Sequence, residues 1–118
     1  MMRTNFSMSD ENITMVSGDT LSFNVIIRDK SGEAVTVNAA TFKAKNNLDT
    51  SSEVSISKSL GSGITQDGDT LTVRLDPSDT ISLVGFFYYD MDITVGTDRF
   101  TLLRGMLQIE QDVRGGLL

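Results

Sequence analysis

The sequence contains no cysteine, no histidine and no tryptophan, and it has a single proline. Without cysteine the chain forms no disulfide, no thiolate metal site and no thiol nucleophile. Without histidine it lacks the usual base of serine hydrolases, the commonest zinc ligand and the side chain that titrates near neutral pH. These absences exclude the most familiar catalytic and metal-binding arrangements. We therefore expect no cofactor, no metal site and no enzymatic activity.

The length and the charge balance narrow the possibilities further. The 118 residues include 16 acidic and 10 basic ones, a net charge of -6. This length suits one domain, which we expect to span residues 1–118 with an ordered core at about 12–114. The surplus of acids argues against binding to nucleic-acid phosphates. Because the chain has neither the apolar run of a signal peptide nor that of a membrane helix, we expect cytoplasmic synthesis and no membrane partner.

Apolar and polar residues alternate with a period of two along most of the chain, which is the pattern of half-buried strands. Glycine and short polar residues separate the alternating segments, as they do at chain reversals. The spacing of these turns predicts an all-β fold, an antiparallel β-sandwich of seven to nine short strands. The clearest segments lie at residues 20–28, 41–45, 53–57, 71–75 and 86–95.

Three local signals add detail to this prediction. Asp67 and Gly68 fit the two central positions of a type I′ hairpin turn. Pro77 ends a strand and starts at most one helical turn, within residues 77–83. The alternation slips by one residue near Leu102, which predicts a β-bulge, and we expect the nearby Gly105 to ease the bend.

Asp90 and Asp92 are two residues apart on the strand at 86–95, so their carboxylates project from the same face. Paired carboxylates bind calcium or act as acid and base, and they also occur simply as the solvated face of a strand. We favour the solvated face, because the sequence supplies no further ligands nearby. No serine has a histidine to activate it, and the glycine loop at residues 61–63 lacks the lysine of a phosphate-binding loop.

The aromatic run at residues 86–89 is the most informative feature of the chain. Alternation places Phe87 and the second tyrosine in the core, and it places Phe86 and Tyr88 on the opposite face. Exposed rings of this size need a cover, which is either a loop or a partner subunit. We predict Phe86 and Tyr88 as interface residues, together with the apolar C-terminal pair Leu117 and Leu118. The alternative for that pair is a frayed terminus.

Several short motifs together resemble small structural proteins of tailed phages and prophages of Gram-positive bacteria. More distantly, they are similar to the immunoglobulin-like N-terminal domain of upper baseplate proteins. The resemblance covers about residues 18–114, with Phe87 in place of a usual tyrosine and no threonine before Arg114. The motifs are Gly18-Asp19-Thr20, the strand at residues 85–93, the strand at residues 101–109 and Asp112-Val113-Arg114.

The resemblance implies an immunoglobulin-like sandwich without catalytic residues. It also implies a place in the virion, in the tail, baseplate or fibre, after synthesis in the host cytoplasm. The expected partners are copies of the same chain or other phage structural proteins, with a homo-oligomer as a plausible form. The alternative function is a β-sandwich module that binds carbohydrate or a cell surface. That alternative predicts a flat pocket containing Tyr88 and acidic neighbours such as Asp90.

Overall fold

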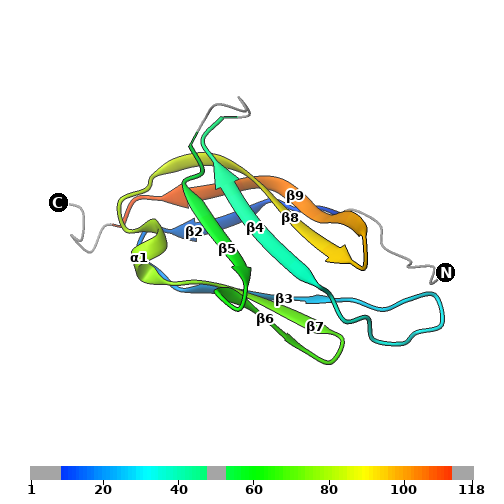
Figure 1. Ribbon diagram of the computed structural model, residues 1–118. Helices are drawn as coiled ribbons and strands as arrows, with labels where there is room; N and C mark the ends of the chain where they lie inside the picture. Colours follow the sequence, from blue (N-terminus) through cyan, green and yellow to red (C-terminus); the bar gives the residue numbers. More distant parts are fainter. Residues whose placement is uncertain (1–8, 48–52, 113–118) are drawn as a thin grey trace.

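A computed structural model describes residues 9–47 and 53–112, and these residues form nine strands and one helical turn (Figure 1). The predicted all-β fold of seven to nine strands is therefore confirmed. Within the described residues no helix exceeds this single turn, so none is long enough to cross a bilayer. The elements are β1 (Ser9–Asp10), β2 (Ile13–Val16), β3 (Leu21–Ile26), β4 (Ala39–Lys45), β5 (Ile56–Leu60), β6 (Gly63–Asp67), β7 (Thr70–Leu75), α1 (Pro77–Thr80), β8 (Gly85–Val95) and β9 (Asp98–Glu110).

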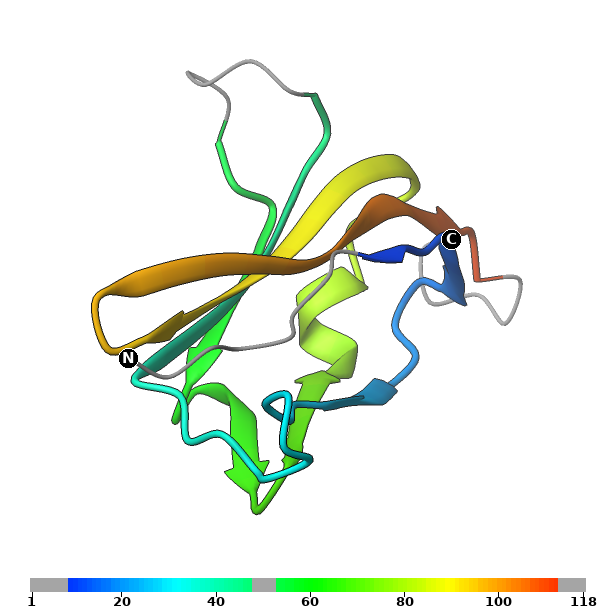
Figure 2. The same cartoon turned by 90° about the vertical axis from the view of Figure 1, so that its right-hand side faces the viewer.

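The strands follow one hydrogen-bonded path, β1-β9-β8-β4-β5-β6-β7-β3, and β2 also pairs with β9. The path folds over between β5 and β6, so that β4, β8 and β9 lie opposite β3, β6 and β7 (Figures 1 and 2). Most neighbours are antiparallel, as predicted. The exceptions are β1 and β2, which run parallel to β9, and a two-residue parallel contact of β5 with β6. The alternation does not reveal β1 and β2, because both are short.

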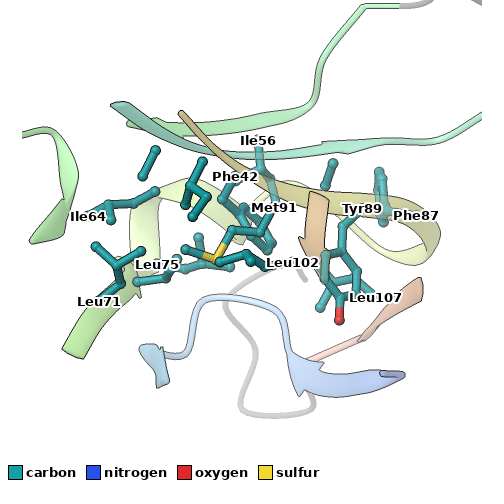
Figure 3. Close-up of a cluster of buried hydrophobic side chains, with 14 of the residues drawn as sticks. Phe42, Ile56, Ile64, Leu71, Leu75, Phe87, Tyr89, Met91, Leu102 and Leu107 are labelled. Carbon is teal, nitrogen blue, oxygen red and sulfur yellow. The ribbon is translucent and has the colours of Figure 1, made fainter. Parts of the chain in front are cut away.

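The core fills the space between the two layers (Figure 3). Phe87 and Tyr89, predicted to face inward, are part of it, whereas Val54, which the alternation groups with the buried Ile56, is exposed. Phe42 of β4 lies at its centre and is fully buried. The ring of Phe42 stacks on Tyr89 of β8 at 5.3 Å and meets Phe23 of β3 edge-on at 6.0 Å. This cluster joins the two layers with aromatic contacts, which contribute beyond their buried area.

The predicted β-bulge lies at Leu102. Met91 pairs with Leu103 and Asp92 pairs with Thr101, which leaves Leu102 as the extra residue of β9. Leu102 is buried, so the bulge keeps both halves of the strand facing the core. At Gly105 itself the register is regular, with Tyr89 as its partner. A Cβ atom at Gly105 would overlap the backbone oxygen of Glu11. Because glycine has no side chain, the N-terminal segment can lie against β9 at this position.

Two other local predictions were wrong in position by a few residues. The β6–β7 turn has Gly68 and Asp69 as its central pair, because Asp67 pairs with Thr70. Gly68 has φ +62° and Asp69 does not have a positive φ, which fits a type II′ rather than a type I′ turn. The strand expected at residues 53–57 is β5, at Ile56–Leu60, because its partner β4 ends at Lys45 and leaves earlier residues without a ladder.

The single helical turn, α1, was predicted within residues 77–83 and is confirmed at Pro77–Thr80. The Asp79 carboxylate caps its first turn by accepting a hydrogen bond of 2.6 Å from the backbone N–H of Asp76. Thr80 is buried and anchors the turn before β3. The Ser17 hydroxyl donates to the Thr80 carbonyl at 2.8 Å, and the Gly18 N–H donates to the Thr80 hydroxyl at 2.9 Å.

Candidate functional site

The outer face of β4, β8 and β9 carries the candidate site, and we call it the β4–β8–β9 face. The structure brings Phe86 and Tyr88 together there, as the alternation predicts. Phe86 is 59% exposed and Tyr88 is 39% exposed, whereas their neighbour Phe87 is 5% exposed on the inner side. No loop of the described chain therefore covers the two rings. Leu117 and Leu118 lie outside the described residues.

An open groove of about 740 Å³ crosses this face. Tyr88 and Met106 lie opposite each other on β8 and β9 and form its apolar part. Val54, which is 41% exposed, borders the same groove. The groove also holds four of the 10 basic residues but only three of the 16 acidic ones, so it is locally more positive than the rest of the chain.

A row of charges crosses the face beside the apolar part. Lys43 on β4 pairs in register with Asp90 on β8, and Asp90 pairs with Arg104 on β9. Arg104 in turn pairs with Asp10 on β1, and its Nε atom lies 3.2 Å from an Asp10 carboxylate oxygen. The signs alternate along these four neighbouring strands. At about 4.8 Å per strand the row is about 14 Å long.

The two aspartates of β8 have different environments. Asp92 is 9% exposed, and its two oxygens accept hydrogen bonds from Arg99 at 2.5 Å and from the Thr101 hydroxyl at 3.0 Å. Asp90 takes part in neither contact. Partial burial, and then the negative charge of Asp92, raises the pKa of the Asp90 carboxyl, while Arg99 and Lys43 oppose that shift. Across residues 9–47 and 53–112 no three acidic side chains converge in a way that would hold a metal ion.

A contact beside the groove was not predicted by the sequence patterns. The Tyr89 hydroxyl donates a hydrogen bond of 2.7 Å to the Glu11 carbonyl, which lies over Gly105. Burial, followed by the charges of Glu11 and Asp10, raises the pKa of Tyr89 to about 12. The Glu11 N–H donates to the Arg104 carbonyl at 2.9 Å. These bonds hold the N-terminal segment on β9 and set Asp10 beside Arg104.

One sequence signal does point to this contact. Gly105 lies in the interior of a strand of 13 residues, where a glycine weakens pairing and commonly marks a close backbone approach. The segment that approaches is more than 90 residues away in the sequence. Its identity follows only from the fold.

No protein-family model matches the sequence, and no curated protein sequence is significantly similar to it. Two solved structures are similar in fold. An endo-fucoidan hydrolase from glycoside hydrolase family 107 matches 88% of this chain with 14% identity and a TM-score of 0.50, and the match spans 13% of that enzyme chain. The swine CD8αα homodimer matches 89% of this chain and 96% of its own, with 10% identity and a TM-score of 0.51.

At these identities the similarity concerns the fold alone, and the CD8 match confirms the immunoglobulin-like β-sandwich. Antibody domains mark this fold with a buried tryptophan that packs on a disulfide between the layers. This chain has neither cysteine nor tryptophan. The aromatic cluster of Phe23, Phe42 and Tyr89 joins the two layers here.

Proposed function

We propose that this protein is a non-enzymatic structural module of a phage virion, associated with the tail, baseplate or fibre. It acts by protein–protein packing through the β4–β8–β9 face. The observation that carries the proposal is the pair of exposed rings, Phe86 and Tyr88, on strand β8, which pairs with β9 along its length. Aromatic side chains on a rigid surface are favoured anchors of protein interfaces, because little conformational entropy is lost when they are covered.

The phage assignment rests on the motif resemblance across residues 18–114. The partners are copies of this chain or other virion proteins, and the net charge of -6 argues against a role on nucleic acid. The state of Asp92 supports a non-enzymatic role. Its carboxylate is already engaged by Arg99 and Thr101, so it is not available as the second member of a catalytic pair with Asp90.

The virion assignment is tested on particles from the bacterium that encodes the chain. After banding in a caesium chloride gradient, the particles are probed with an antibody against the protein. We expect the protein in the particle band, in a constant ratio to the major tail protein. Its presence only in the unbanded soluble fraction would overturn the assignment.

The packing surface is tested separately with the purified protein. The double substitution Phe86→Ala and Tyr88→Ala should lower the average mass in light scattering at high concentration, with the far-UV spectrum unchanged. Ile26→Ala is the matched control, because Ile26 is 58% exposed on the opposite layer. If the control lowers the mass as much as the double variant does, the packing surface is wrongly placed.

The second candidate function is binding of carbohydrate or of a cell surface. The groove contains both Tyr88 and Asp90, which is the arrangement that this alternative requires, and its volume is within the range of ligand sites. A glycan array with the wild-type protein and Tyr88→Ala decides between the two. Binding that is lost in Tyr88→Ala and retained in Tyr88→Phe would favour the glycan module over the packing module.

A further inference from the structure

The charged row on the β4–β8–β9 face has a symmetry of its own, and the inference drawn from it rests on the proposed packing function. From β4 to β1 the signs run positive, negative, positive, negative, at Lys43, Asp90, Arg104 and Asp10. When such a row is turned by 180° about its centre and laid on the original row, every charge meets a charge of opposite sign. The centre lies between β8 and β9.

A two-fold axis in that position, parallel to the strands, has a definite consequence for two facing copies. Strand β8 of one copy then faces β9 of the other copy, and β4 faces β1. Asp90 then faces Arg104 of the partner subunit, and Lys43 faces Asp10 of the partner subunit. All four positions in the row therefore meet a charge of opposite sign.

We propose that the partner on this face is a second copy of the chain, docked face to face about a two-fold axis that runs along β8 and β9. Closed two-fold dimers are the commonest oligomers, and they require a surface that is complementary to itself. Sheets that pack face to face also keep their strands within about 30° of each other. A two-fold axis along the strands satisfies that condition.

The neighbouring row supplies the apolar contact of the same dimer. Tyr88 and Met106 are opposite each other on β8 and β9, so the same axis places Tyr88 on Met106 of the partner subunit. A thioether against an aromatic ring is a favourable contact. Tyr88 and Met106 beside the charged row give an interface that is stabilised by burial and set in register by charge.

Other arrangements of the same two faces are disfavoured by their charges. An axis across the strands at the level of the charged row would place each strand on its own copy, so Asp90 would face the partner subunit's Asp90. Within the described residues the other outer surface, on β3, β7 and β6, lacks a comparable row. Its outward residues are mostly small and polar, with one hydrogen bond between Thr72 and Asn24.

The test uses two charge reversals, Asp90→Arg and Arg104→Asp, made in separate full-length chains. Each variant alone places like charges opposite each other, at two symmetric positions. We expect the Kd of each homodimer to rise at least about tenfold in sedimentation equilibrium at low salt. Arg74→Asp, at an exposed site on β7, is the matched control and should leave the Kd unchanged.

The decisive measurement is the equimolar mixture of the two variants. In a mixed dimer one chain carries two positive charges at positions 90 and 104, and the other chain carries two negative charges there. Each reversed site therefore meets an opposite charge on the other chain. We expect the mixture to recover the wild-type dimer mass, with a Kd within about threefold of the wild-type value. Pairing within one chain cannot explain this recovery, because each variant chain has like charges at the two positions.

Two results would overturn the proposal. One is a wild-type protein that stays monomeric at the highest concentration reached, and the other is a mixture that associates no better than the separate variants. Either result leaves the virion assignment intact if the protein is found in banded particles. Absence from the particles, together with a charge-restored dimer, would instead reject the proposed function and retain the dimer.

Discussion

The two faces of strand β8 differ sharply in solvent exposure. Phe87, Tyr89 and Met91 point inward and are buried. Phe86 and Tyr88 alternate with them along the same strand and point outward. At residues 86–89 each face carries one phenylalanine and one tyrosine, so composition does not separate the two faces there. What separates them is the opposite layer of the sandwich, which covers only the inner side.

This comparison assigns stability and association to different sides of one sheet. Changes on the inner side should reduce the free energy of unfolding and leave the docking surface intact in the molecules that remain folded. Changes on the outer side should alter association with little effect on folding.

The largest effect is expected from truncating adjacent phenylalanines on the two faces. Phe87→Ala should lower the free energy of unfolding by about 3–5 kcal/mol, because it leaves a cavity in the core. Phe86→Ala should change it by less than about 1 kcal/mol, because most of the ring is already in water. Urea denaturation of both variants measures the difference. Equal losses would mean that the two faces are not distinct in stability.

The next effect concerns the two tyrosines, Tyr88 and Tyr89. The pKa of Tyr89 is raised to about 12, so the neutral phenol stabilises the fold below the ordinary tyrosine pKa of about 10, and this contribution is lost as the pH rises to 12. Two pKa units correspond to about 3 kcal/mol. In a Tyr88→Phe background the absorbance at 295 nm reports Tyr89 alone. Ionisation near pH 10 in the folded protein would contradict the buried hydrogen bond to Glu11.

A smaller effect is expected at Gly105. Gly105→Ala puts a methyl group into the Glu11 backbone and should cost about 2 kcal/mol, within the range for overpacked sites. Hydrogen exchange should show faster exchange at the Glu11 amide, which is bonded to Arg104. Arg104→Ala, at the adjacent position on the outer face, should change the free energy of unfolding by no more than about 0.5 kcal/mol. Unchanged exchange at Glu11 in Gly105→Ala would argue against the close approach.

The smallest effect is expected at Asp90. Because its pKa is raised in the folded state, the carboxyl favours the fold below its unfolded pKa, and this contribution is lost as the pH rises through the folded pKa. Asp90→Asn should therefore raise Tm slightly at pH 7, by an amount worth less than about 0.5 kcal/mol after solvent screening. At pH 3 the two proteins should unfold alike. A lower Tm at pH 7 in the variant would contradict the raised pKa of Asp90.

Much of the fold was predictable because alternation is a local property. The inward residues of β3, β4, β7 and β8, the helical turn after Asp76 and the bulge at Leu102 all follow from neighbouring residues. The exposed positions of Phe86 and Tyr88 follow in the same way. The limits of β5 and the centre of the β6–β7 turn were misplaced, because the pairing partner of each strand sets where its ladder starts.

The candidate site was predictable only in part. Its two aromatic residues lie on one strand, and one strand suffices to place them. The charged row takes one residue from each of four strands, and Asp10 and Arg104 are 94 residues apart in the sequence. No periodicity in the chain connects such residues, because their proximity depends on strand order and register.

Side-chain type and the two-residue repeat of an extended backbone were enough to specify the strand-forming segments and the inward face of each. Composition alone excluded disulfides and any catalytic or metal-binding role of cysteine or histidine. The position of the N-terminal segment on β9, its admission by Gly105 and the alternation of four charges across one face became visible only in the folded chain. Those features depend on which strands become neighbours, and that choice is made by the packing of the whole core.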